Sequence, residues 1–525
     1  MHMKTKYYIL FSFLVLLSFS GCQKLEEDPK ALLSPATYFK TQSDLDASVA
    51  AVYTSIARGG GYNFTNRMVS CFGSDDLTTD PALNKGNLRA FDQLNGTSTT
   101  ADFTQQWTNA WAGIYQCNNV IANYGKVQNS TEDLKNAAAA QAYFIRAWCY
   151  FMLVRTFGQT PIIIAPTDVE ARVPREDVSK VYAQIVSDLQ TAISLFPASF
   201  ATAPNKANAL ASKSLLASVY LAMTGWPLND ATNYAKAASA ANEVIQAKKY
   251  SLVADYARVF TTNNNSEAIF AFQFNVTGGY PMRYFGSSSI PLDEVAQDQK
   301  FGGNGNSGWD DFYPEINFFK NAPKCYRSDA TFYTTIKVRN PDKETFKLWP
   351  WYDKNTHAMH PYYKKFRYGL GVPGNGDGCV ETDTKIVSMN PSTNKTCDII
   401  RYPMPLLVYA EASAMAAGAP TTASYDAINL VRQRAGLPNL TPGLSAIAFR
   451  DSVVRERAYE FAGENGERWW DVVRLQLLPK IIAERDPTEN PIPTAIAANP
   501  KDRYLAPIPF NEMNLNPAWT QNPGY

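Results

Sequence analysis

The sequence has 525 residues, of which 45% are apolar and 18% are charged, a composition typical of a folded protein rather than a disordered one. The 49 Lys and Arg residues nearly cancel the 48 Asp and Glu residues, so no overall field attracts a polyanion, which argues against nucleic-acid binding. Three His residues occur, His2, His357 and His360, too few for a multi-His metal centre, and we expect no metal and no cofactor.

Residues 1–21 have the pattern of a bacterial signal peptide. Two lysines precede the apolar run 9–19, which is too short to span a bilayer, and small residues then lead directly to Cys22. Small residues before a Cys resemble a lipobox, in which the thiol of Cys22 is lipidated and becomes the first mature residue. The alternative is a secreted protein with an incidental Cys. We expect residues 22–39 to form an acidic tether, and no later stretch to form a transmembrane helix.

Helical periodicity dominates the regions 40–274 and 401–525. Apolar residues at i, i+3, i+4 and i+7 predict helices at about 44–57, 103–124, 140–154, 177–195, 207–223, 231–247, 405–417, 423–435 and 445–462. A small residue followed three positions later by an aromatic one recurs at Ala147/Tyr150 and Ala217/Tyr220, which is similar to tetratricopeptide packing. The fold class predicted from this pattern is mostly α.

Residues 275–400 differ from both flanks, since they contain short apolar segments, Gly and Pro clusters and many aromatic residues. This composition predicts an irregular, loop-rich insert, and its Trp and Tyr content argues against disorder. The C–H faces of sugar rings stack on Trp and Tyr, while their hydroxyls hydrogen-bond to polar groups around the rim. The candidate stacking residues are Trp349, Trp351, Tyr352, Trp309 and Tyr313. For each ring the alternative is packing in the core.

Polar residues in the loop after the first predicted helix are further candidates for the rim of a ligand site, namely Arg67, Asp75 and Asp76. The two aspartates lack the spacing of an EF-hand calcium loop. Cys379 and Cys397 lie in a Gly- and Thr-rich stretch and could form a disulfide outside the cytosol.

Glu456, Glu460 and Glu464 have the i, i+4 spacing that places side chains on one helix face, which would suit an acid/base pair. Four arginines crowd the same stretch, at positions 455, 457, 468 and 474. Nearby cations lower carboxyl pKa values, whereas the acid of a glycosidase needs a raised pKa. We therefore predict a structural ion-pair network and no catalytic residue.

Four segments together resemble the SusD/RagB family of outer-membrane nutrient-binding lipoproteins. They are QAYFIRAWCYFMLVRTFGQTP (141–161), KANALASKSLLASVYLAMTG (206–225), RERAYEFAGENGERWWDVVR (455–474) and RYLAPIPFNEMNLNPAWTQNPGY (503–525). The resemblance implies a SusD-like fold, in which tetratricopeptide-like helix pairs support an irregular ligand-binding half. It also implies a protein that is not an enzyme, an oligosaccharide ligand and a SusC-like TonB-dependent transporter as partner.

The acidic residues after Cys22 are similar to the signal that sends Bacteroidetes lipoproteins to the outer face of the outer membrane. The resemblance therefore implies a lipid-anchored protein that faces the cell exterior. The alternatives are a RagB-like peptide-binding lipoprotein, a glycoside hydrolase with two carboxylates about 5–9.5 Å apart, and a helical scaffold that binds protein.

Overall fold

The computed structural model describes residues 38–57, 73–81, 85–166, 172–274, 289, 310–339, 346–356, 358–366 and 396–525. The predictions for Cys22, Arg67, Trp309 and Cys379 lie outside the described residues, so the lipid anchor and the disulfide stay predictions.

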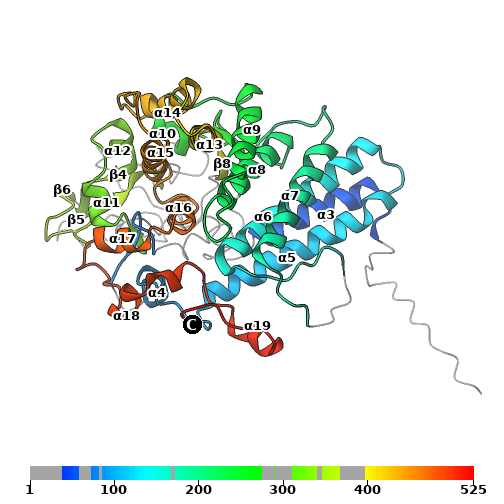
Figure 1. The fold of residues 1–525 in the computed structure, drawn as a ribbon, viewed down its shortest axis with the longest axis horizontal. Helices are drawn as coiled ribbons and strands as arrows, with labels where there is room; N and C mark the ends of the chain where they lie inside the picture. The colour runs from blue at the N-terminus through cyan, green and yellow to red at the C-terminus, as the bar shows by residue number, and fades with distance from the viewer. Residues whose placement is uncertain are drawn as a thin grey trace, which may run out of the picture.

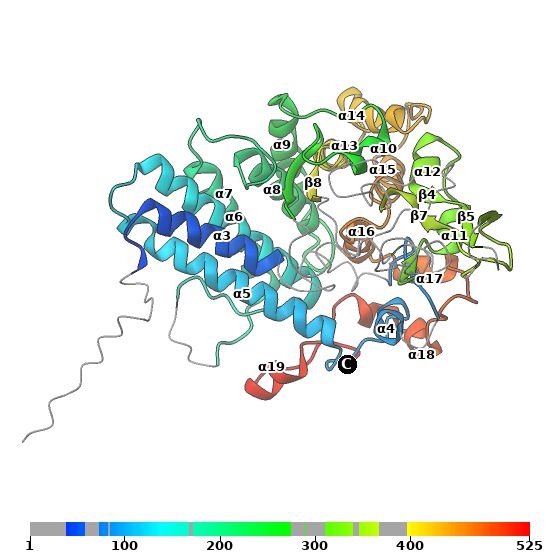
Figure 2. The ribbon, with the colours of Figure 1, turned by 180° about the vertical axis from the view of Figure 1, so that it is seen from behind.

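Long antiparallel helices form one end and the middle of the molecule (Figure 1, Figure 2). Each helix packs on the next along the chain, and α9 packs in turn on α13 near the C-terminal end. This arrangement matches the predicted frame of sequential helix pairs. The helices are α3 (Gln42–Ala57), α5 (Ala101–Asn123), α6 (Glu132–Phe157), α7 (Val178–Leu195), α8 (Ala209–Met223), α9 (Asn233–Gln246), α13 (Pro403–Ala417), α14 (Thr422–Arg434) and α15 (Ala446–Glu460).

Helix α6 is the centre of this frame because it is buried on nearly all sides. It begins at Thr131, whose side chain accepts a hydrogen bond from the N–H of Leu134 at 3.3 Å, and it ends at Gly158 with φ of 73°. In the predicted small–aromatic pair of this helix, Ala147 and Tyr150 are both fully buried. The Arg146 guanidinium reaches both carboxylate oxygens of Asp188 at 2.6 and 2.8 Å, which ties α6 to α7.

Helix α6 bears on the expectation that no stretch after the signal peptide forms a transmembrane helix. It is long and apolar enough to cross a membrane, the one such helix in the described part of the chain, yet 94% of its most apolar window is buried inside the protein. An apolar helix surrounded by other helices is the core of a globular protein, and its composition alone does not distinguish the two cases.

The opposite side of the molecule consists of short helices and short strands. Its helices are α4 (Gly86–Asp92), α10 (Tyr256–Thr261), α11 (Ile316–Lys320), α12 (Tyr326–Thr331), α16 (Glu467–Arg474), α17 (Leu478–Glu484) and α18 (Thr494–Ala498), with 3-10 turns at Lys364–Phe366 and Pro500–Arg503. Helix α19 (Phe510–Leu515) lies below α5 (Figure 1), and a further 3-10 turn, Tyr124–Lys126, continues α5 in the helical frame. Much of the predicted irregular insert that the structure describes lies here, so this segment is regular in part. Its boundaries at 275 and 400 stay predictions.

The strands of the described residues form antiparallel two-stranded pairs. The pairs are β1 (Thr78–Thr79) with β3 (Phe312–Tyr313), β2 (Ala268–Phe272) with β8 (Cys397–Arg401), β4 (Phe332–Tyr333) with β7 (Tyr362–Tyr363), and β5 (Thr335–Arg339) with β6 (Phe346–Pro350). Two of these pairs, β1–β3 and β2–β8, join the insert to its flanks, whereas β4–β7 and β5–β6 lie within the insert.

Candidate functional site

The β5–β6 hairpin carries the strongest predicted stacking residues at the edge of the molecule (Figure 1). Trp349 lies opposite the buried Ile336 in the register of the two strands. Side chains alternate along a strand, so Lys347 and Trp349 lie on the same face, and Trp351 follows in the same row. The N–H of Trp351 donates to the carbonyl of Thr334 at 2.9 Å, which extends this pairing past the end of β6.

The Trp349 ring is half-buried, and the ammonium of Lys347 lies 3.8 Å from its centroid. A cation at this distance over an aromatic face is held by the ring quadrupole. One face of the ring is thus covered by a lysine that is itself exposed and can move. A sugar would stack on the remaining ring surface or displace the lysine side chain.

Trp351 and Tyr352 form the end of this aromatic surface. The half-buried Trp351 ring is edge-on to Phe319, with centroids 5.7 Å apart, and edge-on to Tyr352 at 5.5 Å. Tyr352 is 62% exposed and presents the most open of the three rings. The hydroxyl of Thr356 donates to the carbonyls of Trp351 and Asp353 at 3.0 and 2.7 Å, so the turn that carries these rings is fixed before any ligand binds.

Tyr313, also a candidate for stacking, lies in the core. Its side chain is 2% exposed, its ring stacks on His360 with centroids 4.4 Å apart, and its hydroxyl donates to Asp80 at 3.0 Å. Burial raises the pKa of the hydroxyl well above its ordinary value, and the carboxylates of Asp310 and Asp80 add to the rise. Both faces and the hydroxyl are therefore occupied by the protein, which favours the alternative of core packing for this residue.

The two rim aspartates hold different positions. Asp75 makes a bidentate ion pair with Arg468, whose Nε and Nη2 donate to the two carboxylate oxygens at 2.5 and 2.7 Å. Asp76 is 2% exposed, and its Oδ2 accepts the N–H of Gly463 at 2.8 Å. Asp76 therefore anchors the loop after α3 to the turn between α15 and α16, while Asp75 lies at the edge of a cleft.

This cleft has a volume of about 660 Å³ and lies between α11, α15 and α17. Its size is within the range of ordinary ligand pockets. Phe318 and Tyr459 form its floor as stacked rings, with centroids 4.7 Å apart and planes at 28°. Around the floor lie polar and charged residues that include Asp75, Glu315, Asn317, Asn321, Arg450, Asp451, Arg455, Arg468, Lys480 and Glu484.

Helix α11 connects the cleft to the aromatic hairpin. Phe318 stacks on Tyr459 in the cleft, while the next residue, Phe319, contacts Trp351 of the hairpin. The helix is fixed at its start by Glu315, whose carboxylate accepts the N–H groups of Phe318 and Asp486, both at 2.7 Å. The structure thus brings Asp75 and Trp351 to two sides of one short, capped helix.

The predicted glutamate cluster is a buried ion-pair network, as expected. Glu456, Glu460 and Glu464 are 3%, 0% and 4% exposed. Glu460 accepts hydrogen bonds from Arg401 and Arg434 at 2.5 Å each and from Arg327 at 3.0 Å. The further pairs are Glu456 with Arg327 and Arg432, and Glu464 with Arg401 and Lys365.

The charges around these carboxylates set their pKa values. Burial alone would raise the pKa of Glu460, but the guanidinium groups of Arg434, Arg401 and Arg327 outweigh it and lower the pKa. The pKa of Glu464 is lowered in the same way by Arg401 and Lys365 against the effect of burial. Carboxyls held ionised in this way do not suit a general acid, which agrees with the structural reading of the cluster.

The partners of the cluster differ from those that the sequence suggested. Arg457 and Arg474 instead bind Glu411, at 3.2 and 2.7 Å, and Arg468 binds Asp75. Arg455 is exposed and, among the described residues, has no carboxylate within ion-pair distance. The reason is geometric, because Arg455 and Arg457 point to other faces of α15 than the glutamates beside them, and Arg468 and Arg474 lie on a different helix, α16.

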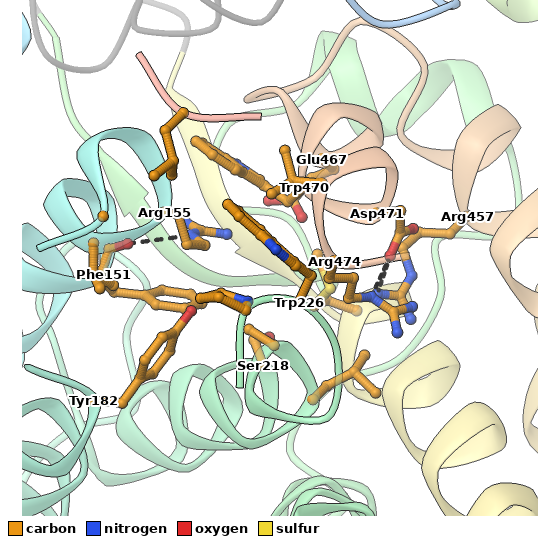
Figure 3. Close-up of a pocket in the computed structure, with 18 residues that line it drawn as sticks. Phe151, Arg155, Tyr182, Ser218, Trp226, Arg457, Glu467, Trp470, Asp471 and Arg474 are labelled. Carbon is orange, nitrogen blue, oxygen red and sulfur yellow. Dashed lines mark hydrogen bonds and ion pairs between the residues drawn. The ribbon is translucent and has the colours of Figure 1, made fainter. Parts of the chain in front are cut away.

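A second, smaller pocket lies between α6, α8 and α16 (Figure 3). The Arg155 guanidinium lies 3.6 Å from the centroid of Phe151 and 4.2 Å from that of Trp470. Figure 3 also shows Asp471 beside Arg474, whose Nε donates to it at 2.9 Å. With a volume of about 50 Å³, this pocket has room for a few water molecules and not for a sugar unit. Its lining residues come from both the helical frame and the C-terminal region.

Sequence reasoning missed several members of the network and the floor of the cleft. Glu267 precedes the buried strand β2 and Arg401 is the last residue of the buried strand β8, and a charged residue at the end of a buried apolar strand is a signal that it needs a partner. Arg327 gives no such signal, because it lies in a short helix of the insert. The pairing of Phe318 with Tyr459 joins residues far apart in the sequence, which no local pattern reveals.

Comparison with known proteins places the chain in a family. A model described as "SusD family" matches residues 248–525, and one described as "Starch-binding associating with outer membrane" matches residues 25–221. The relative SusD-like protein P2 of Formosa agariphila is 29% identical over 550 aligned residues, which cover 99% of this chain and 100% of the relative.

Solved structures show the same fold. A SusD homolog from Bacteroides thetaiotaomicron has a TM-score of 0.77 at 21% identity, with 94% of this chain and 98% of the other covered. Surface glycan-binding protein A from the same species, in complex with laminarihexaose, has a TM-score of 0.69 at 19% identity and coverages of 92% and 100%. A laminarin binding SusD-like protein has a TM-score of 0.69 at 22% identity and coverages of 93% and 100%.

These matches confirm the predicted mostly α, SusD-like fold and the predicted resemblance. Since the SusD family model by itself matches more than half of the chain, the protein belongs to the SusD family.

Proposed function

We propose that this protein is a lipoprotein of the outer membrane that captures oligosaccharides at the cell surface and passes them, unaltered, to a SusC-like TonB-dependent transporter. The observation that carries the binding half of the proposal is the fixed aromatic row on hairpin β5–β6. Trp349 and Trp351 share one face, and Tyr352, 62% exposed, continues the row into solvent. Rings held in a turn that is ordered before binding are suited to stack on successive sugar units.

The relatives support this proposal. The solved structures described above include one in complex with laminarihexaose and one that binds laminarin. The description of the N-terminal family model associates it with the outer membrane. The lipid anchor at Cys22 and the transporter partner rest on the sequence pattern and on the family resemblance.

The absence of catalysis is part of the proposal. The glutamates that would suit an acid/base pair are buried and ion-paired, and the pKa values of Glu460 and Glu464 are lowered rather than raised. A product would form on incubation with a bound oligosaccharide if the protein were a hydrolase. We expect the oligosaccharide to be recovered unchanged.

The test is a glycan array probed with the mature protein, run beside a peptide library. Binding to one class of oligosaccharide and to no peptide is the expected result. Binding to peptides with no glycan signal would replace the proposal by the RagB-like alternative.

Delivery is tested separately, by co-purification of the protein from outer membranes with a TonB-dependent barrel. Recovery of the protein without any barrel would contradict that part of the proposal.

A further inference from the structure

The cleft between α11, α15 and α17 is lined by one cation, Arg455, that has no ion-pair partner among the residues that the structure describes. Every other charged side chain that lines the cleft has a partner on the protein. Asp75 pairs with Arg468 and Asp451 pairs with Arg450, in both cases with a distance of 2.7 Å or less. Glu484 lies 3.7 Å from Lys480, and Glu315 accepts two backbone N–H groups. The Arg455 guanidinium has no such partner among the described residues.

Arg455 is placed to act on a ligand in the cleft. It is exposed, and it precedes Tyr459 by one helical turn, so both side chains lie on one face of α15. The two residues interact electrostatically, since burial raises the pKa of Tyr459 to about 12 while Arg455 acts in the opposite direction. Arg455 and Tyr459 therefore both line the cleft, one helical turn apart on α15.

The floor and the rim together offer the chemistry of a sugar site. The stacked rings of Phe318 and Tyr459 line the cleft, and because each is less than 8% exposed, they contribute a small apolar surface to it. The Tyr459 hydroxyl and the Asn321 amide make no hydrogen bond within the described part of the chain, and both are available to sugar hydroxyls. A guanidinium beside such a surface binds carboxylate or sulfate through two parallel N–H groups.

We infer that this cleft is a second ligand site, in which Arg455 recognises the anionic group of an acidic saccharide. This inference rests on the proposed function, because it names the class of oligosaccharide that the protein takes. Two kinds of acidic saccharide would present a negatively charged oxygen group to Arg455: one with the carboxylate of a uronic acid, and one with a sulfate ester. The neutral sugar units of the same saccharide could then stack on the aromatic hairpin, which α11 places next to the cleft.

The test uses calorimetry with three hexasaccharides on the mature protein. They are neutral laminarihexaose, hexagalacturonate as the carboxylate probe, and a κ-carrageenan hexasaccharide as the sulfate probe. We expect one acidic probe to bind at least about tenfold more tightly than laminarihexaose, with a preference that weakens in high salt. The acidic probe that shows this preference identifies the group.

Variants at Arg455 separate this site from the hairpin. Arg455→Gln should lose about tenfold in affinity for the acidic probe and keep its affinity for laminarihexaose, while Arg455→Lys should retain part of the preference. The matched control is Arg258→Gln, an arginine with 64% of its side chain exposed on α10, which should leave both affinities unchanged. Because Arg455 is exposed and has no ion-pair partner in the described part of the chain, its replacement should not affect folding.

Three results would overturn the inference. The acidic probes could bind no more tightly than laminarihexaose, Arg455→Gln could bind the acidic probe as the wild type does, or hexaglutamate peptide could compete better than the acidic saccharides. In each of these cases, laminarihexaose binding is measured on the wild type and on the Trp349 and Trp351 variants. If the wild type binds and the variants do not, the proposed function stands and this inference alone fails. If no saccharide binds the wild type, both fail.

Discussion

Replacement of Glu460 by Gln tests the structural role of the buried network. Glu460 is fully buried and accepts hydrogen bonds from three arginines, so the change removes a charge and turns one acceptor oxygen into an amide donor that faces a guanidinium. Removal of one partner of a buried ion pair costs about 3–5 kcal/mol, because the remaining charges are left uncompensated. The total stability of a protein is only about 5–15 kcal/mol.

The expected shift in melting temperature follows from the size of the chain. At about 2.1 cal/mol/K of unfolding entropy per residue, a chain of 525 residues shifts by roughly 1 °C for each kcal/mol if it unfolds as one unit. Glu460→Gln should therefore lower the melting temperature by about 3–5 °C in differential scanning calorimetry. The matched control is Glu132→Gln at the start of α6, a side chain 76% exposed, which should shift the melting temperature by about 1 °C or less.

The pH dependence gives an independent check on the same residue. The pKa of Glu460 lies below its ordinary value of 4.5, so the ionised carboxylate contributes stability at neutral pH that is lost as the pH falls below about 4.5. The difference in melting temperature between wild type and Glu460→Gln should thus narrow in acid. The reasoning is refuted if Glu460→Gln melts with the wild type at neutral pH. Loss of saccharide binding in a variant that melts normally would instead place Glu460 in the ligand site.

Two further predictions concern the lipid anchor and a buried lysine. Cys22→Ala should abolish labelling with palmitate and release the protein from the membrane fraction, whereas a variant that still labels would show that the lipobox interpretation is wrong. Burial lowers the pKa of Lys365 from 10.5 to about 8. Between pH 8 and pH 10.5 the lysine is therefore protonated in the unfolded chain and largely neutral in the folded protein. Because the unfolded state binds more protons, the free energy of unfolding should rise with pH in this range. Thermal melts of Lys365→Met should lack this rise, and an identical pH profile in wild type and variant would contradict the lowered pKa.

The helical frame was predictable because its helices are long and periodic. The helix expected at 207–223 is Ala209–Met223, and the one expected at 405–417 is Pro403–Ala417. Periodicity needs about three turns to be read, so α11 and α17, with 5 and 7 residues, gave no signal. The cleft depends on these two short helices and was therefore missed.

The candidate site was predictable only in part, because composition does not tell an exposed ring from a buried one. Tyr352 and Tyr313 both come from the aromatic insert, yet one is 62% exposed and the other 2%. What separates them is tertiary contact, since Tyr313 lies against His360 and Asp80. The partners in the ion-pair network could not be predicted for the same reason, because Glu460 pairs with Arg401 and Arg327 from segments distant in the sequence.

The central claim, that the aromatic hairpin binds oligosaccharide, is tested most directly by calorimetry on Trp349→Ala and Trp351→Ala with the glycan that the array identifies. Loss of a stacking ring should cost about 2 kcal/mol or more, roughly thirtyfold in affinity, while circular dichroism stays that of the wild type. Tyr115→Ala, a 52% exposed ring on α5, is the control and should bind normally. Unchanged affinity in both tryptophan variants would contradict the account.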